Sequence, residues 1–192
     1  MYEIVGMENL QDIYDVVQRT IKTTYPQYYP AEVVAFFCGL HSKEAIAKDI
    51  ENGSVGMIRA DGRIVATGCF VENHITRVYV LPEYQKRGLG TQIMKNLETR
   101  IGETYDSVYL DASLPAAALY EKLGFHTVKH ERYPVENGVV LVYEIMEKHL
   151  FLKADRQADG NGGQHSEVQS VQNMESVINE GIRVALLEDT PD

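Results

Sequence analysis

The sequence has little of several residue types, and each shortage excludes a class of protein. Tryptophan is absent, and the 192 residues include only two cysteines, Cys38 and Cys69. Two cysteines are too few for a disulfide framework and lack metal-ligand spacing, so we expect buried free thiols in a cytoplasmic protein. No apolar run approaches the roughly 18 residues that a membrane-spanning helix needs. The first residues, MYEIVGMENLQDIYD, lack the apolar core of a signal peptide.

Positive charge is also in short supply. The chain has 18 Lys and Arg against 28 Asp and Glu, a formal net charge of -10. Nucleic-acid binding needs clustered cations that displace counterions, so neither DNA nor RNA is an expected partner. The acidic balance favours cationic partners instead. The apolar fraction of 44% is ordinary for a globular domain, and the length allows one core plus an appendage.

The spacing of apolar residues predicts a mixed sheet with helices on its faces, an α/β (α+β) arrangement. The dipeptide Asp61-Gly62 predicts a tight hairpin turn between two strands. Apolar residues at helical spacing, together with capping residues, predict helices over 9–22, 30–41, 42–53, 89–101 and 114–123. Alternation predicts strands over 2–5, 54–59, 63–71, 75–80, 107–111, 125–133 and 139–146.

The composition changes near Lys153, which predicts three segments. We expect one domain over residues 1–150 and a Gly-rich, polar linker over residues 151–167. Residues 168–192 carry apolar side chains at helical spacing, followed by GIRVALLE, which suits a strand. We interpret them as an accessory tail that docks on the domain or on a second copy, which would make a homodimer.

The segment YVLPEYQKRGLGTQIM, residues 79–94, has two glycines at the mouth of a predicted helix. Unpaired N–H groups and the helix dipole favour an anion there, and glycine lets the main chain approach it closely. A P-loop would need Lys after Gly90, and a dinucleotide fingerprint would need Gly in place of Ile93. The pattern that fits is Q-x-x-G-x-G, from Gln85 to Gly90. The alternative is a tight strand-to-helix turn without a ligand.

This segment resembles the acetyl-CoA pyrophosphate loop of the GCN5-related N-acetyltransferases, the GNAT superfamily. A second segment, ASLPAAALYEKLGF (residues 112–125), is similar to the family's late helix, N-x-x-A-x-x-x-Y-x-K-x-G-F. The resemblance covers about residues 2–148 and implies the GNAT fold, a mostly antiparallel twisted sheet splayed between its fourth and fifth strands. It also implies acetyl transfer from acetyl-CoA to a primary amine by direct attack in a ternary complex, without a metal. The alternative is a catalytically silent acyl-CoA-binding regulatory module.

The resemblance places the coenzyme in the wedge between those two strands, which we expect to splay because Pro82 cannot donate to a ladder. The pantetheine arm would pair with the main chain near Tyr79, and the N–H of Val80 would contact the thioester carbonyl. Ser113 stands where the family often has Asn and offers fewer hydrogen-bonding groups. The residues expected at the coenzyme are Tyr79, Val80, Leu81, Gln85, Lys86, Arg87, Gly88, Leu89, Gly90, Thr91, Ser113 and Tyr120.

The resemblance also suggests catalytic residues. Tyr120 matches the family's tyrosine and would give a proton to the coenzyme A sulfur; the alternative is an aromatic side chain that only packs. His74 falls where some members carry a catalytic glutamate, and Glu72 lies two residues earlier, on the same expected strand face. A histidine suits a base near neutral pH, although a chain of water molecules would also serve.

The loop TTYPQYYP is the candidate wall of the acceptor pocket. Tyr25, Tyr28 and Tyr29 could pack an apolar stem and present hydroxyls or a ring face to an ammonium group. The alternative is an aromatic loop that closes the core. The acceptor would be a small-molecule or peptide amine, which the sequence does not identify further.

Overall fold

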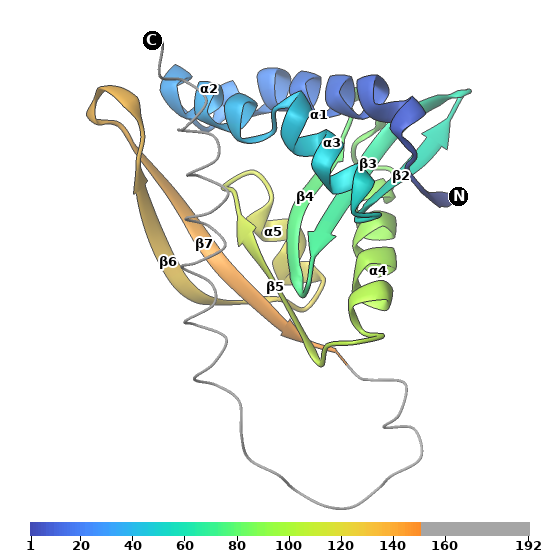
Figure 1. Cartoon of the computed structure of the whole chain (residues 1–192). Helices are drawn as coiled ribbons and strands as arrows, with labels where there is room; N and C mark the ends of the chain where they lie inside the picture. The colour runs from blue at the N-terminus through green and yellow to red at the C-terminus, as the bar shows by residue number, and fades with distance from the viewer. Residues whose placement is uncertain (151–192) are drawn as a thin grey trace, which may run out of the picture. The chain divides into compact units, whose positions relative to one another are not determined.

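The computed structural model describes residues 1–150, whose elements follow the predicted order (Figure 1). The predicted linker and tail lie outside the described residues. The helices are α1 (Leu10–Thr24), α2 (Ala31–Leu40), α3 (Lys43–Glu51), α4 (Leu89–Ile101) and α5 (Ala117–Lys122). The strands are β1 (Tyr2–Ile4), β2 (Val55–Ala60), β3 (Arg63–Val71), β4 (His74–Val80), β5 (Ser107–Ala112), β6 (His126–Pro134) and β7 (Val140–His149).

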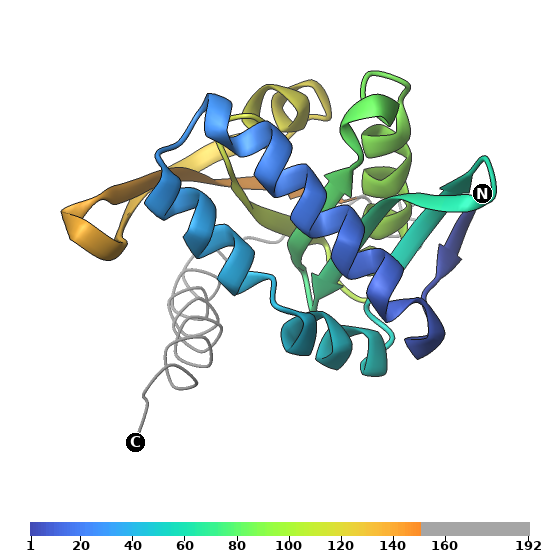
Figure 2. The same cartoon turned by 90° about the horizontal axis from the view of Figure 1, so that it is seen from above.

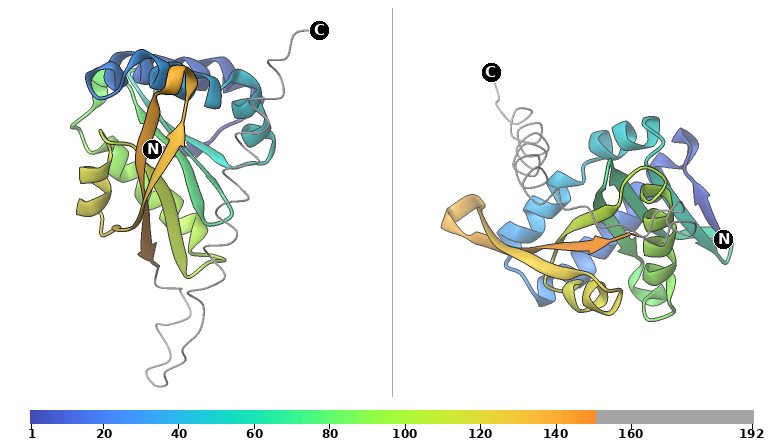
Figure 3. Two further views of the ribbon diagram at one scale, coloured as in Figure 1. Left: turned by 90° about the vertical axis from the view of Figure 1, so that its left-hand side faces the viewer. Right: turned by 90° about the horizontal axis from the view of Figure 1, so that it is seen from below.

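The strands form one sheet in the order β1-β2-β3-β4-β5-β7-β6, so the β6–β7 hairpin lies at one end of the sheet, with β6 as the edge strand, and β1 is the other edge (Figure 3). Within residues 1–150 every neighbouring pair is antiparallel except β4 and β5, which run parallel. These two central strands pair only at His74 with Tyr109 and at Ile75 with Leu110. The mixed sheet and the splay between the fourth and fifth strands are therefore confirmed.

The predicted cause of the splay was wrong. The pairing of β4 with β5 ends at Ile75, well before Pro82. From there β4 stays paired with β3 as far as Val80, whereas β5 stays paired with β7 as far as Ala112. Each strand thus follows its own antiparallel neighbour, and the sheet's twist carries the two apart. The result is a wedge between two halves of the sheet.

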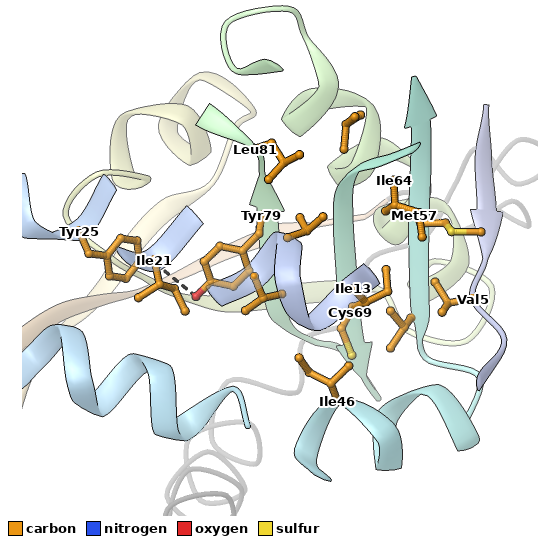
Figure 4. Packing of buried hydrophobic residues seen from close by; sticks show 14 of the residues in the cluster. Val5, Ile13, Ile21, Tyr25, Ile46, Met57, Ile64, Cys69, Tyr79 and Leu81 are labelled. Atoms are coloured by element: carbon orange, nitrogen blue, oxygen red, sulfur yellow. Dashed lines mark hydrogen bonds between the residues drawn. The ribbon is translucent and has the colours of Figure 1, made fainter. Parts of the chain in front are cut away.

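Helices cover both faces of the sheet, with α1, α2 and α3 on one side and α4 and α5 on the other (Figure 2). Alternation along each strand supplies both cores: Met57 faces α1 and α3, whereas the adjacent Ile58 faces α4. Figure 4 shows part of the first core, where Ile13 and Ile46 pack against the sheet. Burying one such aliphatic side chain contributes about 1.5–3 kcal/mol.

Two helix starts differ from the prediction. Pro30, expected as the first helical residue, is the N-cap of α2 with an extended ψ of 167°. The last helix was expected to start at Leu114 but begins at Ala117. Before it the chain makes a turn in which Ser113 O accepts hydrogen bonds from Ala116 N at 2.9 Å and Ala117 N at 3.1 Å. Pro115, which has no N–H to donate, lies inside this turn.

The structure also bears on the expectations for the cysteines, for membrane-spanning helices and for metal ligands. Cys38 and Cys69 are free thiols, and burial raises the pKa of Cys69 to about 12. In the described part of the chain no helix is long and apolar enough to span a bilayer. Over the same residues, no cluster of three or more His, Cys, Asp or Glu side chains could hold a metal ion.

Candidate active site

A cavity of about 470 Å³ opens between the splayed strands and the mouth of α4. The end of α1, strand β4, the loop before α4 and the start of α5 contribute to its wall. The structure therefore brings together segments that are far apart in the sequence. The predicted residues that line the cavity are Tyr25, Tyr79, Val80, Gln85, Lys86, Gly88, Leu89, Gly90, Thr91, Ser113 and Tyr120.

The mouth of α4 suits an anion. Gly88 is the N-cap in the left-handed region, with φ 80°, and no acidic residue stands in the first turn of the helix. The first main-chain N–H groups of a helix have no intrahelical partner and carry the positive end of its dipole. A Cβ on Gly90 would lie 3.4 Å from Leu119 Cδ2 and 3.9 Å from Val80 Cγ2, two residues of the cavity wall. The glycines thus leave main-chain N–H groups accessible from the cavity, which fits a bound diphosphate.

The two cations before the glycines lie differently. Lys86 lines the cavity and has a left-handed φ of 60°. Arg87 is not part of the wall: its Nη2 donates to Glu83 O at 2.8 Å, and its guanidinium lies 4.8 Å from the centre of the Tyr84 ring. The structure therefore brings Lys86, but not Arg87, to the cavity.

Strand alternation determines which main-chain groups of β4 face the wedge. Leu81 N donates to Val65 O at 2.9 Å, so the N–H of Leu81 points toward β3. Successive residues of a strand point their N–H groups to opposite sides, so the N–H of Tyr79, two residues before Leu81, also faces β3, and that of Val80 faces the wedge. The carbonyl of Val80 already accepts from Thr20 Oγ1 at 3.3 Å and Gln85 Nε2 at 3.0 Å. Val80 N–H is thus the donor that the fold presents to the wedge, whereas that of Leu81 is already bonded.

Hydroxyl groups gather on one wall of the cavity. The Tyr25 hydroxyl lies 3.4 Å from that of Tyr79 and donates to Ser113 Oγ at 3.3 Å; Figure 4 shows the tyrosine pair. Tyr120 is buried nearby, and burial raises the pKa of all three phenols, Tyr25, Tyr79 and Tyr120. Phenols held in this neutral form donate hydrogen bonds but give up their protons reluctantly.

The other two tyrosines of TTYPQYYP are not at the cavity. Tyr29 is buried, and its hydroxyl accepts a hydrogen bond from Leu114 N at 2.7 Å. This bond fixes the turn that follows β5, so Tyr29 supports the site from outside. Tyr28 is 50% exposed. Of the three tyrosines, only Tyr25 lines the cavity.

His74 and Glu72, the candidate bases, do not line the cavity. His74 is buried at the start of β4, where its ring stacks on Tyr109 at 4.4 Å and its Nε2 lies 3.2 Å from Asp111 Oδ2. That distance is an ion-pair distance, but neither ring nitrogen has a partner in hydrogen-bond alignment. Glu72 does not share a strand face with His74, because it is exposed in the preceding turn with a left-handed φ of 55°.

Sequence reasoning missed Asp111 and a polar group behind Tyr79. The His41 ring contacts the Tyr79 ring edge-on at 5.4 Å, and burial together with the charge of Arg77 lowers the pKa of His41. Arg77 is itself buried and pairs with Asp49 of α3. His41, Asp49 and Arg77 stand on three different segments without motif spacing, so no sequence pattern indicated that they would meet.

The fold and the cavity define a class of protein. A parallel pair of strands that separates beside a glycine-capped helix is the arrangement expected of the GNAT fold. The sequence model described as "Acetyltransferase (GNAT) domain" matches residues 24–150. The chain therefore belongs to the GNAT acetyltransferase family, and it is an N-acetyltransferase.

Known relatives agree with that assignment. The chain is 26% identical over 135 residues to an N-alpha-acetyltransferase of Saccharolobus solfataricus, covering 64% of this chain and 78% of that protein. It is 26% identical over 127 residues to the uncharacterized N-acetyltransferase YafP of Escherichia coli, covering 65% and 79%.

Two solved structures share the fold. A GCN5-related N-acetyltransferase from Rhodopseudomonas palustris superposes with a TM-score of 0.71 at 22% identity, over 78% of this chain and 95% of that one. The PaiA N-acetyltransferase from Thermoplasma acidophilum, solved in complex with coenzyme A, gives a TM-score of 0.61 at 19% identity, over 78% and 98%.

Proposed function

We propose that this protein transfers an acetyl group from acetyl-CoA to a primary amine by direct attack within a ternary complex. The observation that carries the proposal is the single cavity that joins the mouth of α4, the wedge and the buried hydroxyls. The coenzyme A complex of the PaiA structure, which shares this fold, supports the choice of coenzyme.

The residues of the cavity suit acetyl-CoA, which would supply the thioester as the acetyl donor. The N–H groups at Gly88, Gly90 and Thr91 would hold its diphosphate, and Lys86 would partly neutralise the charge. The N–H of Val80 faces the wedge and would polarise the thioester carbonyl. Tyr120, whose pKa burial raises, would stabilise the departing thiolate chiefly as a hydrogen-bond donor.

The attacking amine must be neutral, so its proton needs an acceptor. We propose that His74 and Asp111 receive it, with water as the carrier. Asp111 is the first residue of β5 beyond the last pair with β4, so it stands where the wedge opens. Ser113, two residues further on, lines the cavity and accepts from Tyr25. Neither Ser113 nor Tyr25 is hydrogen-bonded to the pair, so water would carry the proton from the cavity to Asp111.

The acceptor is proposed from the relatives and from charge. Relatives from three archaea are named N-alpha-acetyltransferases, and two structures that share this fold are named ribosomal-protein-alanine N-acetyltransferases. A peptide α-amine is therefore the first acceptor to test, with polyamines next because the net charge of -10 favours cations.

One observation favours the silent acyl-CoA-binding module as a second candidate. The described residues of the cavity wall include hydroxyls and lysines but no Asp, Glu or His. A site that only senses acyl-CoA would need no proton acceptor at the wedge.

The two candidates are separated by one assay on the purified chain. Calorimetry with coenzyme A measures binding, and thiol release from acetyl-CoA with alanine-initiated tetrapeptides, lysine and spermidine measures turnover. We expect binding together with amine-dependent release, and Tyr120→Phe should lower kcat by about 10- to 100-fold, the cost of one hydrogen bond to a charged group. Binding without release on any amine would favour the silent module. Absence of coenzyme A binding would refute both.

A further inference from the structure

The loop that leads into α4 is tied to residues outside the cavity. Its single 3-10 turn, Pro82–Tyr84, presents a tyrosine that lines the cavity and is only 6% exposed. The Tyr84 hydroxyl donates to Asp61 Oδ2 at 2.7 Å and accepts from Arg63 Nη2 at 3.2 Å. Asp61 belongs to the turn between β2 and β3, and Arg63 begins β3. The coenzyme loop is therefore tied to a hairpin that contributes no residue to the cavity wall.

A neighbouring carboxylate extends the same connection to α1. Glu83 lies 3.0 Å from Arg19 Nη1 and 3.2 Å from Arg63 Nη2. These partners are half exposed, so each ion pair contributes little on its own. The Tyr84 hydroxyl is more enclosed, and its bond to a carboxylate is the stronger, charge-assisted kind. The central contact of the connection is therefore the one between Tyr84 and Asp61.

The loop needs such support because its backbone is strained. Lys86, which is not glycine, has a φ of 60°, and Gly88 follows with a φ of 80°. A left-handed non-glycine residue costs roughly 1–2 kcal/mol, so an unsupported loop would relax out of this shape. Arg87 adds a further restraint, since it bonds to Glu83 O and stacks over the Tyr84 ring. The N–H groups of Gly88 to Thr91 are thus aimed before any ligand arrives.

We propose that Asp61, Arg63 and Tyr84 form a latch that presets the coenzyme loop and so sets the affinity for the diphosphate of coenzyme A. This inference rests on the proposed function, because it assigns the latch to the same coenzyme site. Asp61 and Arg63 act as positioning residues: neither side chain lines the cavity. A loop that already has its bound conformation loses less conformational entropy when the ligand binds. The smaller entropy cost makes the binding tighter.

Two substitutions weaken the latch. Tyr84→Phe deletes the hydroxyl, but on a residue that also lines the cavity. Asp61→Asn lies outside the cavity wall, keeps a residue that tolerates the left-handed φ of 52° at this turn, and turns the charge-assisted hydrogen bond into a neutral one, so it tests the latch without changing the wall. Tyr105→Phe, which deletes a hydroxyl in the segment between α4 and β5, is the matched control.

Calorimetry with coenzyme A on the full chain tests the latch. Losing the hydroxyl's bonds in Tyr84→Phe, or the charge assistance in Asp61→Asn, should weaken binding by about 3- to 10-fold in each variant. The double variant should be no weaker than the worse single one, because both substitutions break the same contact. Hydrogen exchange should speed up at the amides of residues 85–91, and Asp61→Asn should raise KM for acetyl-CoA. The control should match the unaltered chain in every measurement.

Unchanged affinity for coenzyme A in both variants would refute the proposal. A fall in their melting temperatures alone would mean that the contact stabilises the fold without affecting coenzyme binding. Independent, additive losses would also overturn the latch. If the unaltered chain fails to bind coenzyme A, the proposed function fails and the latch fails with it. Normal binding by the unaltered chain with unaffected variants refutes the latch alone.

Discussion

Replacing Gly90 by alanine should raise the stability of the protein and weaken its binding of coenzyme A. Gly90 is the second residue of α4, where alanine restricts the unfolded chain and favours the helix. The gain is about 0.5–1 kcal/mol wherever the new methyl fits. It does fit: the methyl would lie 3.4 Å from Leu119 Cδ2, an ordinary van der Waals contact. The same methyl projects among residues of the cavity wall, where it keeps an anion away from the main chain.

Gly88→Ala is the matched comparison, because it changes the same residue type two positions earlier. A methyl there meets no atom within 4 Å, but the φ of 80° is unfavourable for alanine. That conformation costs roughly 1–2 kcal/mol, so Gly88→Ala should lower stability. The two alanine variants should therefore shift the free energy of unfolding in opposite directions.

The affinity for coenzyme A separates a binding role from a structural one. Losing one charge-assisted hydrogen bond costs about 1.5–3 kcal/mol, which corresponds to roughly 10- to 150-fold weaker binding for Gly90→Ala. Urea unfolding gives the stability and calorimetry gives the dissociation constant. If Gly90→Ala binds coenzyme A as tightly as the unaltered chain, the diphosphate does not approach this main chain.

The remaining predictions concern the core and the tail. Asp49→Ala should cost roughly 3 kcal/mol in urea unfolding because it leaves Arg77 buried and unpaired, and an Asp49→Ala/Arg77→Met double variant should recover part of the loss. Because the folded pKa of His41 is lowered, the unfolded chain binds the extra proton, so stability should fall as pH drops below about 6.5. His41→Gln should flatten that slope between pH 5 and 7, and an unchanged slope would mean that other groups cause it. Light scattering of the chain with and without residues 154–192 should show a dimer that becomes a monomer; equal masses would contradict a role for the tail.

The sequence predicted the elements whose signals are local. Alternation and the Asp61-Gly62 turn gave the β2–β3 hairpin, and both residues of that turn have positive φ. The pattern from Gln85 to Gly90 predicted where α4 begins. The N-cap of α4 has a left-handed φ, which favours glycine, so this start depends on a short segment of the chain alone.

Properties that depend on packing between distant segments were beyond the sequence. The sequence does not distinguish the three tyrosines of one loop. In the structure Tyr25 lines the cavity, Tyr29 supports a turn and Tyr28 faces solvent. Asp111 stands beside His74 only because β4 and β5 run parallel for two residue pairs. The splay itself was predicted for the wrong reason, since its cause is the partner each strand keeps.

The unpaired side of β4 amounts to a sheet edge hidden inside the molecule. An open edge normally attracts another strand and causes aggregation, and proteins usually cover or charge it. Here β5 begins to cover the edge and then withdraws, leaving an opening bounded by α1 and α5. A slender amide-containing arm could enter this opening and pair with the edge as a strand does. On the proposed function, an edge that is a common hazard in β-proteins becomes the binding site of a ligand that pairs as a strand does.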